Sequence, residues 1–171
     1  MDTDTKKFGL SKLTIGLAVF IILSASFTRY ILNFLYKNVG KNNLQISAVL
    51  VFAVVGVLFV GYLIKASIPK TNLFIIIVLL LSGLVCSQFI KIVEERIHIL
   101  EYGLLGWLAV CDVVDKQRHK TFLYAGGFVF LVGMLDEGFQ YILPNRVCDI
   151  RDVVFNTIGG LWGIILRILK S

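Results

Sequence analysis

The feature that most constrains this chain is a series of apolar runs, most of them about 20 residues long, separated by short charged segments. A helix needs about 20 apolar residues to cross a bilayer core, and it satisfies its own backbone hydrogen bonds there. Such runs occur at residues 13–36, 44–64, 73–92, 97–111, 121–142 and 150–169. We therefore expect an all-α fold, a polytopic transmembrane helical bundle of about six spans.

Composition excludes an ordinary soluble domain, because 57% of the residues are hydrophobic and only 16% are charged, against about 25% charged in soluble proteins. The net charge of +6 does not indicate a nucleic-acid partner, since the Lys and Arg residues lie in short loops and form no basic stripe. The expected partner is the lipid bilayer. We expect residues 1–171 to form a single membrane domain, with the first apolar run retained as a helix.

The distribution of basic residues predicts the orientation of the spans. Ten of the 17 Lys and Arg residues lie in the segments on the side of both termini, and seven lie on the other side. Basic loops are retained in the cytoplasm. We therefore expect a multi-pass protein with both termini in the cytoplasm.

The last three runs differ from the first three because each has polar residues at one end. These residues lie at the start of the run 97–111, at the end of 121–142 and at the start of 150–169. Successive spans alternate in direction, so the three polar ends meet on one side, which the orientation makes extracytoplasmic. We expect a polar intramembrane site there. Its candidate residues are Arg96, His98, Glu101, Tyr102, Asp136, Glu137, Gln140, Arg146, Asp152 and Asn156.

Spacing predicts that these residues face one another. His98, Glu101 and Tyr102 recur at intervals of three and four, and Asp136 and Gln140 are four apart, so each set shares one helix face. Carboxylates at membrane depth cost at least about 2.5 kcal/mol each, which makes them functional candidates by default. For the first set, an interfacial helix end in contact with water is the alternative.

The adjacent carboxylates of Asp136 and Glu137 repel each other unless a cation lies between them. Arg146 is one candidate cation and a divalent metal is another, so the sequence leaves the cofactor open. Asp149, just before the last run, is either part of the site or only a helix N-cap. Small residues at Gly159, Gly160 and Gly163 favour close packing of the last helix, which would carry Asn156 inward.

Three motifs carry a resemblance to a known family. They are E-R-I-H-I-L-E-Y-G-L-L-G (Glu95–Gly106), D-E-G-F-Q-Y-I-L-P-N-R (Asp136–Arg146) and D-V-V-F-N-T-I-G-G-L-W-G (Asp152–Gly163). In order and spacing they resemble the VanZ-like family of bacterial membrane proteins. The motif region covers residues 95–163 and includes none of the first three runs. It departs from the family at Asn145, where Gly is usual, and at Arg96, where Lys is usual.

This resemblance implies a bacterial cell-membrane location and a link to low-level resistance to glycopeptide antibiotics, teicoplanin in particular. It implies a polar set of Arg96, His98, Tyr102, Asp136, Glu137, Gln140, Arg146, Asp152 and Asn156. It supplies no reaction, so whether the protein is an enzyme stays open.

The leading hypothesis is a site that binds or modifies a cell-envelope molecule, either lipid-linked or peptidoglycan-related. In a hydrolase or transferase, His98 with Asp136 or Glu137 would supply general acid and base. Arg96 and Arg146 would hold a phosphate or carboxylate, and Asp152 and Asn156 would orient the set or complete a metal site. The alternatives are a non-catalytic accessory membrane protein and a small proton-coupled transporter.

Overall fold

The computed structural model describes residues 9–90, 93–113, 118–144, 146 and 149–170, and these form helices and short connections. The helices are α1 (Lys12–Val39), α2 (Lys41–Lys65), α3 (Lys70–Phe89), α4 (Val93–Asp112), α5 (Arg118–Ile142) and α6 (Ile150–Lys170). The all-α prediction is confirmed, and each predicted run corresponds to one helix. The largest difference is at α4, which begins at Val93 and so includes the charged residues that precede the apolar run.

Local signals explain where helices begin and end. The Ser11 hydroxyl accepts a hydrogen bond of 3.2 Å from the Thr14 amide, which satisfies one of the free donors at the start of α1. Gly40 separates α1 from α2 and has a φ of 86°. This conformation is easily reached only by glycine, so Gly40 allows the two long helices to turn directly into a hairpin.

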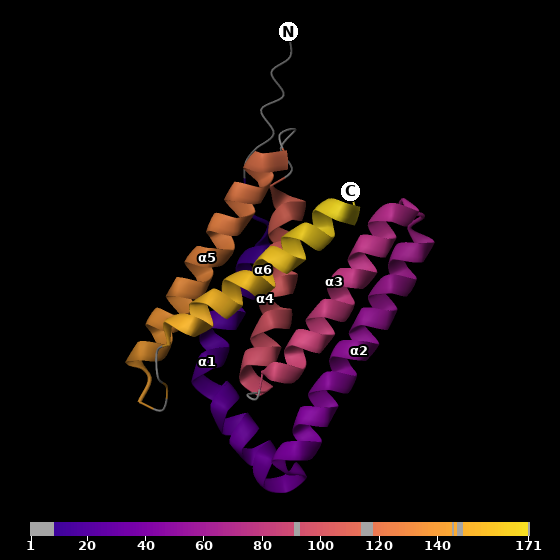
Figure 1. The fold of residues 1–171 in the computed structure, drawn as a ribbon. Helices are drawn as coiled ribbons and strands as arrows, with labels where there is room; N and C mark the ends of the chain where they lie inside the picture. Colours follow the sequence, from indigo (N-terminus) through magenta and orange to yellow (C-terminus); the bar gives the residue numbers. More distant parts are fainter. Residues whose placement is uncertain (1–8, 91–92, 114–117, 145, 147–148, 171) are drawn as a thin grey trace.

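Successive helices run in opposite directions, so their ends lie at two opposite faces of the bundle (Figure 1). At one face the Ser11 amide donates to the Asp112 carboxylate at 2.8 Å, which ties the start of α1 to the end of α4. At the same face the Asn72 side chain donates to the Leu169 carbonyl at 2.8 Å, which ties α3 to α6. The polar ends of α4, α5 and α6 lie at the opposite face, as the alternation of spans predicts.

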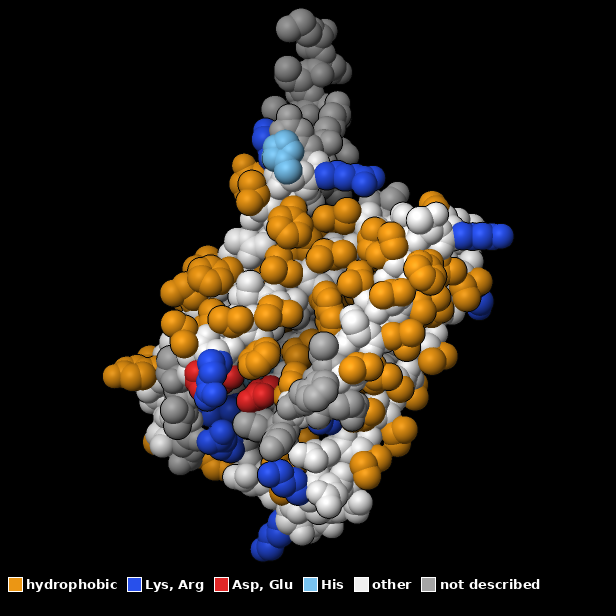
Figure 2. Space-filling model, in the orientation of Figure 1, with side chains coloured by type: hydrophobic (Ala, Val, Ile, Leu, Met, Phe, Trp, Pro, Cys, Tyr) orange, Lys and Arg blue, Asp and Glu red, His pale blue; other side chains and the backbone are white. Residues whose placement is uncertain are grey.

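The outer surface of the bundle is strongly apolar. Val57, Leu58 and Phe74 are 72%, 68% and 68% exposed, and hydrophobic side chains cover most of the face shown in Figure 2. A monomeric soluble protein rarely exposes so much continuous apolar surface. The surface is therefore suited to contact with lipid.

Length and composition identify four helices that are able to cross a membrane, namely α1, α2, α5 and α6. In α3 the apolar stretch within the described residues is shorter, covering Lys70–Val85, and α4 carries ionisable residues in its first half. The helical membrane bundle is confirmed. Among the described residues, the helices that meet this criterion are slightly fewer than the six spans expected.

The closest contact in the bundle is between α4 and α6, whose backbones touch at glycines. A Cβ atom added to Gly163 would overlap the carbonyl of Gly103, and one added to Gly106 would overlap the carbonyl of Gly160. A Cβ on Gly159 would lie 2.9 Å from the Ile99 carbonyl oxygen. Such contact between backbones requires glycine on both helices. The predicted small-residue stripe is therefore confirmed as a packing surface.

The remaining helices pack around this pair. On α5, Val129 occupies the space where a Cβ of Gly160 would be. On α3, Gly83 leaves room for the indole of Trp162. One face of α6 therefore packs against α4, α5 and α3, and this face includes the buried Asn156 and Ile164.

We predict that Gly163→Ala destabilises the protein, because the added methyl group overlaps a backbone carbonyl that cannot rotate away. Overpacking of this kind costs about 1–3 kcal/mol. The matched control is Gly127→Ala in α5, where an added Cβ has no atom within 4 Å. Unfolding in mixed detergent micelles checks the prediction, and equal stability of the two variants would contradict it.

Candidate functional site

Polar side chains from three helices gather where α4 begins, α5 ends and α6 begins. Red and blue side chains lie together at the lower left of Figure 2, within an otherwise apolar face. Besides Tyr102, four residues of this cluster are almost fully buried. Their exposed fractions are 0% for Asp136, 2% for Glu137, 4% for Gln140 and 2% for Asn156.

Tyr102 lies at the centre of the cluster. It is fully buried, and its hydroxyl donates a hydrogen bond of 3.1 Å to the Asp136 carboxylate, linking α4 to α5. The rings of Tyr102 and His98 have centroids 6.2 Å apart. Gly133 on α5 adjoins both Tyr102 and Asn156, since a Cβ added to it would lie in van der Waals contact with them, at 3.8 Å and 3.7 Å. Tyr102 thus contacts polar residues of its own helix and α5, and lies close to α6.

Glu137 is held by both of its carboxylate oxygens. One accepts a hydrogen bond of 3.0 Å from the Gln140 side chain. The other accepts a hydrogen bond of 3.1 Å from the backbone amide of Asp149, just before α6. A buried carboxylate needs hydrogen-bond donors. Because one of the two donors is the Asp149 amide, this interaction joins the end of α5 to the start of α6.

Asp149 acts as the N-cap of α6. Its carboxylate accepts a hydrogen bond of 2.9 Å from the Arg151 backbone amide, which is the usual geometry of an N-cap. The Arg151 guanidinium also binds this carboxylate. The hydrogen bond from the Arg151 side chain, and to a smaller extent the one from its backbone amide, lowers the pKa of Asp149. The cap interpretation of the sequence is therefore confirmed, while the Asp149 backbone contributes to the cluster.

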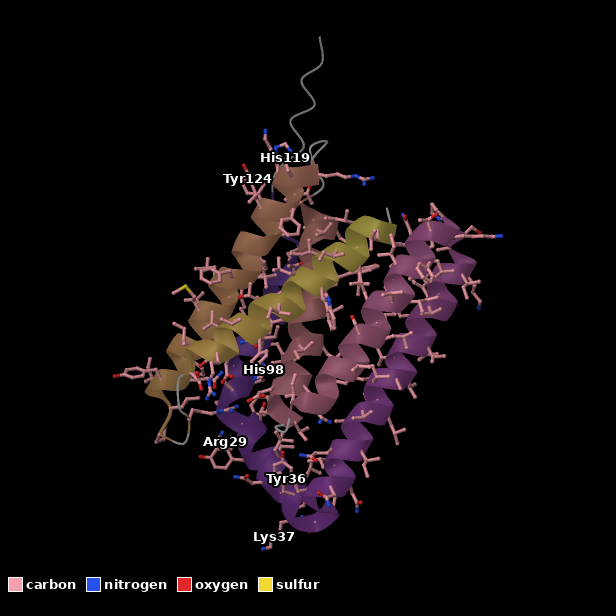
Figure 3. All side chains as sticks on the ribbon, viewed as in Figure 1. Arg29, Tyr36, Lys37, His98, His119 and Tyr124 are labelled. Carbon is pink, nitrogen blue, oxygen red and sulfur yellow. The ribbon has the colours of Figure 1, made fainter. Side chains whose placement is uncertain are left out.

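His98 and Glu101 lie one turn apart at the edge of the cluster. The His98 Nδ1 atom is 3.4 Å from a Glu101 carboxylate oxygen, and the two side chains are 13% and 22% exposed. Despite this short distance, the two atoms are not oriented for a hydrogen bond, and His98 Nδ1 has no hydrogen-bond partner among the described residues. Both side chains are thus less buried than Asp136 and Glu137. Figure 3 shows His98 in the lower half of the bundle, above Arg29, Tyr36 and Lys37.

Arg146 supplies positive charge to the cluster. Its Nε atom donates a hydrogen bond of 3.1 Å to the Ala25 carbonyl, which anchors the connection after α5 to α1. Its charge acts on His98, Asp136 and Glu137. Asp152, in the first turn of α6, acts on the same two carboxylates with a negative charge. Of the two cations that the sequence allows, Arg146 thus lies near enough to act on both carboxylates.

Arg96 lies elsewhere. Its guanidinium donates two hydrogen bonds to the Ile90 carbonyl, at 2.9 Å and 2.6 Å, and one of 3.2 Å to the Gln45 carbonyl. It also lines a separate cavity of about 430 Å³ with Asn42 and Gln45 on α2. Arg96 thus connects α4 to α2 and to the end of α3. The structure brings the other nine candidate residues together but places Arg96 beside this cluster, facing α2.

Three buried polar atoms on α4, α5 and α6 have no hydrogen-bond partner among the described residues. They are Nδ1 of His98, Oδ1 of Asp136 and Nδ2 of Asn156. Each comes from a different helix. Buried polar groups without partners are costly and uncommon in native proteins, so these atoms mark where a bound polar group would be stabilised.

The structure adds two features that the sequence analysis missed. Gly103 and Gly106 on α4 provide the surface against which α6 packs, and their spacing of three residues was a visible signal. The Asp149 amide is the second donor to Glu137, and no sequence pattern identifies a backbone donor of this kind. Asn145 lies outside the described residues. No group of three or more His, Cys, Asp or Glu side chains within the described part of the chain is arranged to hold a metal ion.

Comparison with known proteins identifies the family. The family model described as VanZ/LLP1 matches residues 9–171, nearly the whole chain. The chain belongs to the VanZ/LLP1 family. The match extends through α1, α2 and α3, on which the sequence motifs do not rest. No curated protein and no solved structure matches the chain.

In this VanZ/LLP1 protein, we predict that Tyr102→Phe reduces the free energy of unfolding by about 1–3 kcal/mol, because it leaves a buried carboxylate oxygen of Asp136 without its donor. Tyr141→Phe is the matched control, since Tyr141 is on the same helix as Asp136 but is 78% exposed. Unfolding in mixed detergent micelles measures both variants. Similar losses in the two would show that the Tyr102 hydroxyl makes no special contact.

Proposed function

We propose that the chain binds the polar part of a cell-envelope molecule, lipid-linked or peptidoglycan-related, in the cluster formed by α4, α5 and α6. The observation that carries the proposal is the set of three buried atoms without partners, on His98, Asp136 and Asn156. A ligand hydroxyl would donate to the Asp136 oxygen, and a phosphate, carboxylate or hydroxyl oxygen of the ligand would accept from Asn156 Nδ2. The candidate substrate-binding residues are Glu101, Tyr102, Gln140, Arg146 and Asn156. Arg96, expected from the sequence to hold an anion, instead donates to the Ile90 and Gln45 carbonyls.

The position of the cluster supports a ligand that reaches the membrane from its surface. Its residues lie at the ends of α4, α5 and α6, close to the bundle face and within apolar helices. The Arg146 charge and the Asn156 amide are suited to anionic and carbonyl oxygens, respectively. The family resemblance to proteins linked with glycopeptide resistance favours a molecule of the cell envelope, because such antibiotics act there.

A catalytic role is the second candidate, and the mixture of groups favours it. Imidazole, carboxylate and guanidinium groups lie together in a buried site. Burial and neighbouring charges are what adjust the pKa values of acid and base groups in enzymes. His98, Asp136, Glu137 and Asp152 would then serve as acid, base and orienting groups for a hydrolase or transferase. A non-catalytic site tolerates Glu137→Asp, which keeps the charge, whereas a catalytic site does not.

We predict that expressing the protein in a glycopeptide-susceptible bacterium raises teicoplanin resistance, and that His98→Ala returns it to the level of the empty vector. His98 loses its contact with the cluster in this variant. His119→Ala is the matched control, because His119 is exposed at the opposite end of the bundle (Figure 3). Minimum inhibitory concentrations at equal membrane abundance are the measurement.

Resistance retained by His98→Ala, Asp136→Asn and Asn156→Leu alike would refute the proposal. Loss of resistance in Glu137→Asp as well would favour catalysis over binding. In that case the purified protein should turn over lipid-linked precursors, and Glu137→Gln should abolish this turnover.

The proposed site is on the extracytoplasmic side, because the excess of basic residues lies on the side of the termini. A green fluorescent protein fused after Ser171 is therefore expected to fluoresce in bacterial cells. The usual green fluorescent proteins become fluorescent in the cytoplasm but not after export across the membrane in an unfolded state. A fusion in the turn at Gly40 is expected to stay dark. The reverse pattern would place both termini outside and the cluster at the cytoplasmic surface.

A further inference from the structure

A second cavity, largely apolar, lies on the other side of α4 and α6 from α5. It has a volume of about 460 Å³ and is bounded by α2, α3, α4 and α6. Its walls include Phe52 and Gly56 of α2, Leu104 of α4 and Trp162 of α6. The glycines of the α4–α6 contact also line it, so this packing creates both the polar cluster and the cavity. Its size is within the range of small-molecule and lipid-chain sites.

One end of this cavity carries positive charge. Tyr62 and Trp107 line it, and both rings are in contact with cations of α6. The Arg167 guanidinium lies 5.8 Å from the Trp107 ring centroid, and the Lys170 ammonium lies 5.1 Å from that of Tyr62. These distances are those of cation–π contacts. Both cations remain half-exposed at the rim.

We propose that this cavity binds one acyl chain of an anionic phospholipid, whose phosphate lies against Arg167 and Lys170. The apolar walls suit a hydrocarbon chain, and the charge at the rim is complementary to a lipid phosphate. Basic pockets between transmembrane helices bind anionic head groups in this way. The phospholipid would occupy the space between the α2–α3 hairpin and the rest of the bundle.

This lipid site is separate from the proposed envelope-molecule site. Asp152 and Asn156 are near the start of α6, whereas Arg167 and Lys170 are in its last turn, so the two sites lie at opposite membrane surfaces. With the orientation expected from the sequence, the lipid belongs to the cytoplasmic leaflet. Its presence does not depend on the function of the polar cluster.

The test measures lipid binding to the purified, delipidated full chain in a neutral detergent by native mass spectrometry. The probes are dioleoyl phosphatidylglycerol and dioleoyl phosphatidylcholine, which share chains and differ in net charge. The wild type is expected to bind the anionic lipid more tightly. The double variant Arg167→Gln with Lys170→Gln is expected to lose this preference. Its affinity for the anionic lipid should fall by about five-fold for each cation removed. Lys37→Gln with Lys41→Gln is the charge-matched control, because both lysines are exposed at the other end of the bundle.

A second pair of variants tests the chain cavity. A Cβ on Gly56 has no atom within 4 Å, so Gly56→Leu is expected to fill the cavity and weaken binding of both lipids. Gly61→Leu on the same helix is the control, because Gly61 is exposed and does not line the cavity. Equal wild-type affinity for the two lipids would overturn the proposal. So would equal lipid binding by Gly56→Leu and Gly61→Leu.

Discussion

The contact between the backbones of α4 and α6 is the constraint on which the rest of the structure depends. Gly103 and Gly163 bring the two helices so close that no side chain separates them. Van der Waals contact of this kind drives helix association in lipid, where apolar burial offers no advantage. One flank of the pair faces α5 and holds the polar cluster, while the other faces α2 and α3 and encloses the apolar cavity.

The same contact explains how polar residues are tolerated within apolar helices. An unpaired carboxylate inside a membrane is costly, yet Asp136 receives a donor from Tyr102 and Glu137 receives two donors from α5 and the start of α6. Two of these hydrogen bonds, from Tyr102 to Asp136 and from the Asp149 amide to Glu137, join α5 to other segments, so they exist only while those segments are closely packed. The positive charge of Arg146 further compensates the paired carboxylates. The buried atoms that remain without hydrogen-bond partners, on three helices, are the ones to which we propose a ligand binds.

Much of this arrangement was predictable from the sequence. Apolar runs determine the helices, and the alternation of direction places the polar ends of α4, α5 and α6 together. Side-chain direction was less predictable, because Arg96 is long enough to reach either the cluster or α2, and it donates to the Gln45 and Ile90 carbonyls. The apolar cavity was not predictable, since it depends on how far the α2–α3 hairpin lies from α4 and α6.

A double-mutant cycle between Gly163→Ala and Tyr102→Phe tests most directly whether helix packing holds the polar cluster together. Free energies of unfolding would be measured in mixed micelles for the wild type, both single variants and the double variant. If the added methyl group in Gly163→Ala displaces α4 from its place between α6 and α5, the Tyr102 hydroxyl moves away from Asp136 on α5. Removing that hydroxyl in the double variant should then cost little. We expect a coupling energy of about 0.5–3 kcal/mol. Additive effects, within about 0.5 kcal/mol, would show that the cluster forms independently of the glycine contact.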